Sequence, residues 1–90
     1  MISDIGPLEE ACKNKLQVVL NYTKKTTGEN VQHQGGIYEI NGDILWLWDT
    51  NLNDNIRKFL IENINSFEVL NISFFPPQQF PIKINGEIVG

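Results

Sequence analysis

The sequence predicts a mostly β protein of the α+β class, in which a short N-terminal helix precedes five strongly bent antiparallel strands. Apolar and polar residues alternate with a period of two over several short runs, which is the pattern of strands with one buried face. Turn-forming dipeptides separate these runs, and Asn-Gly occurs twice. The 90 residues, 41% of them hydrophobic and 20% charged, suffice for one core but not for two domains.

The predicted helix spans roughly residues 7–15. Pro7 suits a first helical position, because the N–H that proline lacks has no partner there in any helix. Glu9 and Glu10 follow in the first turn and lysines stand near the end, which matches the helix dipole at both ends. A helix this short is stable only when its apolar stripe packs on a larger surface, so we expect it to lie against the strands.

Five strand-like segments follow, each bounded by turn residues. The predicted strands are residues 16–22, 31–40, 44–48, 56–61 and 67–74, with a helical turn over 62–66 before the last. Gly35-Gly36 interrupts the second strand, where a bulge or sharp bend is expected. Pro76-Pro77 ends the fifth. We therefore expect one domain over residues 1–75 and a C-terminal extension over 76–90, which can add a small hairpin.

The strongest turn signal is Asn41-Gly42, because both residues tolerate the positive φ angles of a two-residue hairpin turn. With this turn, Tyr38 pairs with Leu45. One face of the hairpin then carries Tyr38, Ile40, Leu45 and Leu47, and the other carries Ile37, Ile44, Trp46 and Trp48. Both faces are apolar, so one lines the core and the other is expected to meet the helix, the tail, a partner or a ligand. The predicted core comprises Leu16, Val18, Leu20, Leu45, Leu47, Phe59, Ile61, Ile64 and Val69.

Charge and cysteine content argue against several classes of function. A net charge of −4 disfavours broad electrostatic binding of duplex DNA, which depends on lysine and arginine. Cys12 is the single cysteine, so no internal disulfide can form. No cationic start followed by an apolar run marks a leader, and no apolar run approaches the length of a membrane span. A cytoplasmic location is the resulting expectation.

Few residues are suited to catalysis or metal binding. His33 is the only histidine, so the sequence offers no histidine cluster for a metal, and no cofactor is expected. A nucleophilic pair of Cys12 with His33 has no support beyond the presence of both residues. Asp43, Asp49 and Asp54 stand near predicted turns, where aspartate commonly makes local hydrogen bonds. The sequence therefore favours a binding module over an enzyme.

The order of elements and several short segments point to a known family. A helix and five strands, with a helical turn before the fifth, is the element order of the small Sm-like β-barrel, and open five-stranded Greek-key barrels have similar lengths. The segments are Leu8-Glu9-Glu10-Ala11, Val18-Val19-Leu20-Asn21-Tyr22, Gly42-Asp43-Ile44-Leu45-Trp46-Leu47-Trp48-Asp49, Arg57-Lys58-Phe59-Leu60-Ile61, Ile64 and Phe67-Glu68-Val69-Leu70. In this order and spacing, over about residues 8–72, the chain resembles the WYL domain family. Domains of that family are Sm-like barrels found mostly in bacterial transcriptional regulators and phage-defence proteins.

The resemblance implies that the chain binds a nucleotide or nucleic acid and that Arg57 faces the ligand, with Tyr22 and the strand 44–48 nearby. The residue chemistry is compatible with this role, because the guanidinium group of Arg57 can hold a phosphate bidentately above the apolar ring of Phe59. Trp46 and Trp48 can stack on a base, pack in the core or under the helix, or form a protein interface. The predicted ligand-binding set is Arg57, Tyr22, Trp46, Trp48, Phe59 and His33.

Two functions remain open at this point. The first is a non-catalytic, WYL-like sensor or accessory module that binds a nucleotide or short single-stranded nucleic acid and has a regulatory role. The alternative is a protein-interaction or self-assembly module, in which the second apolar face and an open fifth strand pair with another chain. Under this alternative, Arg57 is an exposed strand arginine paired with a surface acid.

Overall fold

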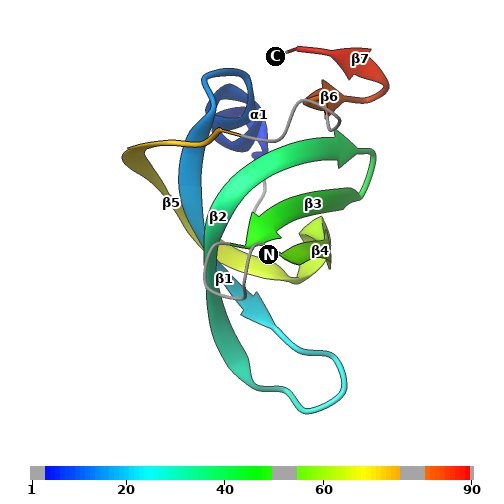
Figure 1. Ribbon diagram of the computed structural model, residues 1–90. Helices are drawn as coiled ribbons and strands as arrows, with labels where there is room; N and C mark the ends of the chain where they lie inside the picture. The colour runs from blue at the N-terminus through cyan, green and yellow to red at the C-terminus, as the bar shows by residue number, and fades with distance from the viewer. Residues whose placement is uncertain (1–3, 50–54, 76–80, 90) are drawn as a thin grey trace.

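Figure 1 shows a short helix packed against one strongly curved sheet. The computed structural model describes residues 4–49, 55–75 and 81–89. In chain order the elements are α1 (Gly6–Lys13), β1 (Leu16–Thr23), β2 (Asn30–Asn41), β3 (Ile44–Asp49), β4 (Asn55–Leu60), the 3-10 turn η1 (Ile61–Asn63), β5 (Ile64–Ser73), β6 (Lys83–Ile84) and β7 (Glu87–Ile88). The predicted class, mostly β with one short N-terminal helix and a helical turn before the fifth strand, is confirmed.

Helix α1 is anchored by its apolar stripe. Leu8, Ala11 and Cys12 are buried against the sheet, and the helix contacts β1, β2 and β5. It ends earlier than predicted, because Lys15 adopts a positive φ of 55° that turns the chain into β1. The Lys15 carbonyl then accepts a hydrogen bond from the backbone N–H of Phe74, 2.7 Å away. No helix among the described residues is long and apolar enough to cross a membrane.

The sheet has the strand order β4-β3-β2-β1-β5, and all of these neighbours are antiparallel. β2 is the longest strand, and its first half pairs with β1 while its second half pairs with β3. β4 and β5 are the two edges, and no ladder joins them within the described ranges. The sheet is therefore bent as expected for a small barrel, but hydrogen bonds do not close it.

Two glycines lie where β2 is paired on both sides. Gly35 and Gly36 are each paired with a residue of β1 on one side and with a residue of β3 on the other. A Cβ atom on Gly35 would stand 1.9 Å from the carbonyl oxygen of Trp48, and one on Gly36 would stand 1.9 Å from the ring of Phe74. Close backbone approach and ring packing thus require glycine here. The register shift between β2 and β3 falls slightly later than the glycines, between Ile37 and Glu39.

The hairpin register predicted from Asn41-Gly42 is wrong by one residue on each strand. Asn41 pairs with Ile44 and Ile40 with Leu45, so the turn residues are Gly42 and Asp43. Gly42 has a φ of 58° and its N–H donates to Oδ1 of Asn85, a contact from the C-terminal part of the chain that the local sequence pattern does not report. This displacement of the turn leaves Ile40 and Leu45 on the same face, as predicted. The separate register shift between Ile37 and Glu39 places Ile37 in the core and leaves Tyr38 half-buried.

The core lies between α1 and the concave face of the sheet, which we define as the face that carries Leu20, Leu45 and Leu47. Most of the predicted core is confirmed, since Val18, Leu20, Leu45, Leu47, Phe59, Ile61 and Ile64 are all buried. Two predictions are wrong. Leu16 is half-buried at the start of β1, and Val69 is 39% exposed because β5 has a neighbour on one side only.

The C-terminal segment adds to the same core. β6 pairs with β2 in parallel and with β7 in a hairpin around Asn85 and Gly86, both of which have positive φ. Ile82 and Ile84 are buried by this arrangement, and the backbone N–H of Asn85 donates to the carbonyl of Ile40. The hairpin is therefore held to β2 by both backbone bonds and apolar contacts.

We predict that Gly36→Ala lowers the free energy of unfolding by about 1–3 kcal/mol, the usual cost of an extra methyl group in a packed core. The cause would be the ring of Phe74, so the same substitution should cost much less in a Phe74→Ala background. Urea unfolding followed by tryptophan fluorescence measures both. Gly6→Ala is the control, because its Cβ meets only the exposed Asp4 side chain. Equal effects of the Gly36 change with and without the Phe74 ring would contradict this explanation.

Candidate functional site

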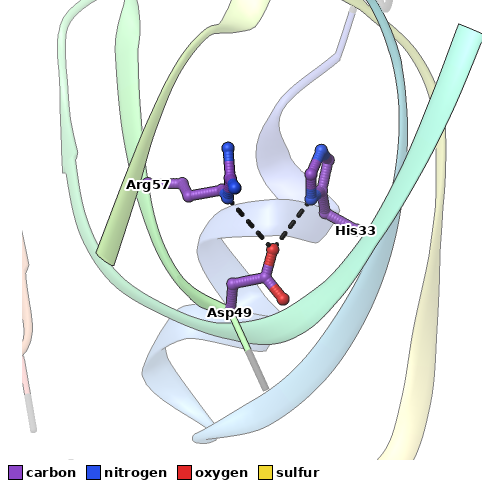
Figure 2. A network of polar contacts seen from close by, with 3 residues as sticks. All are labelled: His33, Asp49 and Arg57. Carbon is purple, nitrogen blue, oxygen red and sulfur yellow. Dashed lines mark hydrogen bonds and ion pairs between the residues drawn. The ribbon is translucent and has the colours of Figure 1, made fainter. Parts of the chain in front are cut away.

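Three strands bring His33, Asp49 and Arg57 together on the concave face. His33 on β2 stands opposite Leu20, and Arg57 on β4 stands opposite Leu47, so both point to the side that Leu20 and Leu47 share. Asp49 ends β3 and continues the buried alternation of Leu45 and Leu47. Because the sheet curls, β4 approaches the first half of β2 across the concave face, and the three side chains meet there (Figure 2).

The Asp49 carboxylate is the centre of this group. Its side chain is 0% exposed, and Oδ2 lies 2.8 Å from Nδ1 of His33 and 3.5 Å from Nε of Arg57. A buried carboxylate is strongly unfavourable unless it is paired and hydrogen-bonded. An ionised carboxylate can only accept, so Nδ1 of His33 carries the hydrogen and donates a hydrogen bond to Asp49. In the neutral ring, Nε2 is then the nitrogen with the free lone pair.

Arg57 is held by one nitrogen and leaves the others available. Its side chain is 45% exposed, in contrast to the buried carboxylate that it faces. Nε points to Asp49, and Figure 2 shows one terminal guanidinium nitrogen turned away from Asp49. Within the described part of the chain, Asp49 is the recorded ion-pair partner of Arg57. The alternative interpretation of Arg57, an exposed arginine paired with a surface acid, differs from this arrangement because the acid is completely buried.

The ring of Phe59 packs against two residues of the concave face, His33 and Tyr22. Its ring centroid lies 5.1 Å from that of His33 and 4.9 Å from that of Tyr22, the latter in an edge-on arrangement with an interplanar angle of 73°. These contacts join β4 to β1 and β2 across the concave face by side-chain packing. Phe59 is only 4% exposed, so its ring cannot serve as the predicted floor for a ligand. Instead, it fixes the orientation of His33 and Tyr22.

The predicted ligand-binding set divides into two groups. Arg57, His33, Tyr22 and Phe59 lie together on the concave face. Trp46 and Trp48 alternate with Leu45, Leu47 and Asp49 along β3, so they point to the opposite face, beside Lys58 and Ile56. Both tryptophans are half-buried, and Trp48 packs against the core. They are not placed to stack on a ligand held by Arg57.

Asp49 is the functional residue that the sequence interpretation missed. Its position near a predicted turn suggested local hydrogen bonding, whereas its partners lie 16 and 8 positions away in β2 and β4. The available signal was the buried alternation of β3, which places position 49 on the same face as Leu45 and Leu47. Asp43, by contrast, is exposed in the hairpin turn, and Asp54 lies outside the described residues.

Cys12 and His33 have separate partners. The thiol of Cys12 is buried and donates to the carbonyl oxygen of Ile37 at 3.6 Å. Burial, with a smaller contribution from the negative charge of Glu9, raises the pKa of the Cys12 thiol to about 12, so the thiol stays protonated at neutral pH. No group of three or more potential metal ligands occurs among the described residues.

The arrangement is suited to binding an anion. Asp49 and a singly charged Arg57 cancel, so the group is neutral when His33 is neutral and positive when His33 is protonated. The cancelled charge lowers the strength of binding, and Arg57 is the donor for an anion while the ring of His33 is neutral. No protein-family model matches the chain, and no curated protein or solved structure matches it significantly. The chemistry of this concave group is therefore what indicates a function.

We predict that Asp49→Ala lowers the free energy of unfolding by about 3–5 kcal/mol, the usual result of removing one partner of a buried charged pair. Asp49→Asn should cost less, because the amide oxygen still accepts the hydrogen bond from His33. Urea denaturation at neutral pH measures both changes. Asp43→Ala is the matched control in an exposed turn and should change stability by less than about 0.5 kcal/mol. Similar results for Ala at positions 49 and 43 would show that the buried contacts contribute little.

Proposed function

We propose that this chain is a non-catalytic, WYL-like module of the cytoplasm that binds a nucleotide or a short single-stranded nucleic acid through Arg57, with a sensor or accessory role in regulation. The observation that supports this most directly is the ion pair between buried Asp49 and Nε of Arg57. Because Nε is paired with a buried carboxylate 3.5 Å away, the guanidinium group is biased toward one orientation before a ligand arrives, which reduces the entropy lost on binding. Such a fork matches the geometry of a phosphate group.

The charge of the whole chain favours a small ligand over a long one. A net charge of −4 repels an extended polyanion, whereas a single phosphate at Arg57 is attracted locally. Arg57 is nearly half exposed, so salt screens this attraction. We therefore expect weak, salt-sensitive binding of a ligand with one or a few phosphates.

Tyr22 is the aromatic residue best placed to contact a base. It is half-buried on the same face as Arg57 and packs edge-on against Phe59, which leaves part of its ring accessible. A base stacked on an aromatic ring is bound with little sequence preference. The recognition of phosphate by Arg57 and of a base by Tyr22 would together favour a nucleotide over a simple anion.

Arg57→Ala is expected to weaken binding of nucleoside 5′-monophosphates by about 1.5–3 kcal/mol, the range for a lost hydrogen bond to a charged group. Isothermal titration calorimetry at low salt measures this change. Arg57→Lys keeps a cation beside Asp49 but loses the planar fork, so it should also weaken binding while leaving stability closer to that of the unaltered protein.

Lys58→Ala is the matched control for these variants. Lys58 is the next residue on β4, is exposed, and points to the opposite face beside Trp46. It has the same charge as Arg57 and therefore reports the general effect of removing one cation. If Lys58→Ala weakens binding as much as Arg57→Ala, attraction is nonspecific and the concave group is structural.

A second candidate function is self-assembly through β5. This edge strand is ten residues long, and it exposes Val69 and Ile72 by 39% and 48%, while Phe75 just beyond it is 86% exposed. An open edge with apolar side chains is a common site for pairing with another chain. This surface is separate from the group around Asp49, so the two functions are compatible.

If β5 mediates assembly, the chain should form dimers or larger species across the micromolar range, and replacing Val69 and Ile72 together by lysine should shift it toward monomer. Lysine on an edge strand disfavours strand addition because the charges must be desolvated. Analytical ultracentrifugation measures the distribution. A wild-type chain that is monomeric throughout this range would exclude the second candidate and leave nucleotide binding unaffected.

A further inference from the structure

His33 has one ring nitrogen that its structural role does not use. Nδ1 is bound to Asp49 at 2.8 Å, and the ring is held at 5.1 Å from that of Phe59, so the direction of Nε2 is fixed. Figure 2 shows Nε2 of His33 and one terminal nitrogen of Arg57 turned away from Asp49, toward the same side in this view. The two side chains therefore present their remaining nitrogens to one common space.

The accessibility of these nitrogens limits what can reach them both. The side chain of Arg57 is 45% exposed, whereas that of His33 is 15% exposed. An internal phosphodiester has a nucleoside on each side, and both would have to enter the concave face for the phosphate to approach His33. A terminal phosphate has one such substituent and can project inward. Because His33 is less accessible than Arg57, the site favours a terminal phosphate over an internal one.

The protonation of the ring adds a chemical criterion. With Nδ1 donating to Asp49, Nε2 of the neutral ring is an acceptor and repels a phosphate oxygen. Nε2 becomes a donor only when it gains a proton, and a dianion stabilises the resulting cation more than a monoanion does. A phosphomonoester carries close to two negative charges at neutral pH, while a phosphodiester carries one.

From these observations we propose that the concave group recognises a terminal phosphomonoester, which is held jointly by Arg57 and by His33 after His33 has taken up a proton. This inference rests on the proposed nucleotide-binding function and specifies the part of the ligand that is bound. The proton comes from the solvent and is added to Nε2, while Nδ1 keeps its hydrogen bond to Asp49. Among the described residues, the charged groups that face the ring are Asp49 from β3, which contacts it, and Arg57 from β4, which contacts the same carboxylate. Tyr22 from β1 is the titratable group that packs on the other ring neighbour, Phe59.

The test compares ligands that differ only at their end. A dithymidine carrying a 5′-phosphate and the same dinucleotide with a 5′-hydroxyl are titrated by calorimetry at about pH 8, where an ordinary histidine is mostly neutral. Each titration is repeated in two buffers of different ionisation enthalpy, which measures the protons taken up. We expect the phosphorylated form to bind about tenfold more tightly or better, as for one additional charge-assisted contact, with net proton uptake.

His33→Asn is the informative variant. The asparagine amide can replace Nδ1 as a donor to Asp49, but it has nothing in place of Nε2. The preference for the phosphorylated end and the proton uptake should both disappear, while binding that depends on Arg57 remains. Urea unfolding of the variant shows whether the fold is retained. Independently of any variant, the NMR titration midpoint of His33, the only histidine, should move to higher pH when the phosphorylated ligand is bound.

The outcomes separate this inference from the proposed function. Equal affinity for the two dinucleotides, or an unchanged midpoint for His33, would overturn terminal-phosphate recognition even if Arg57-dependent binding is observed. Failure of every nucleotide and dinucleotide to bind would overturn the proposed function itself. Inorganic phosphate is included as a third ligand. If it binds as tightly as the phosphorylated dinucleotide, the recognition of a phosphate end is supported and the nucleoside part of the proposed function is rejected.

Discussion

The close pairing of β2 with both β1 and β3 at Gly35 and Gly36 is the constraint on which the remaining structure depends. Each glycine lies where a side chain would collide with backbone or with the ring of Phe74. Because three strands approach so closely at this point, the sheet curls, and β4 comes to face the first half of β2. The contacts of Phe59 with Tyr22 and His33 complete the curvature by packing, although the sheet remains open between its edges.

The buried carboxylate of Asp49 is the second organising element, and it connects the stability of the fold to the proposed site. Its burial requires partners, and His33 and Arg57 supply them from two other strands. Each partner uses one nitrogen for Asp49 and keeps the rest for another ligand. A hydrophobic residue at this position could stabilise the fold equally well. It would not, however, form the contacts that orient His33 and Arg57. The proposed binding role would account for a polar centre at this position.

Much of the fold follows from local sequence patterns. The helix, the strands and most of the core were predictable, because apolar alternation and helix-end signals depend on neighbouring residues. The hairpin register was not. Asn41-Gly42 and Gly42-Asp43 are both acceptable turns, and the choice between them depends on the contact of Gly42 with Asn85 and on a register shift next to Ile37. Between Ile37 and Glu39, β2 carries one extra residue relative to β3, which reverses the alternation on the far side of this shift. Ile37 therefore lies in the core and Tyr38 is half-buried.

The candidate site divides in the same way between sequence and tertiary structure. The sequence by itself excluded a histidine cluster and an internal disulfide, because these conclusions need only residue types and their number. It also predicted Arg57 as the anion-binding residue, from the WYL resemblance and from the chemistry of a guanidinium group. Tertiary structure decided which side chains accompany Arg57. In the fold, Asp49 is buried and contacts both Arg57 and His33, whereas Trp46 and Trp48 lie on the other face of the sheet. Strand alternation can be recognised locally, but contacts across a curved sheet depend on its curl, to which residues far apart in the chain contribute together.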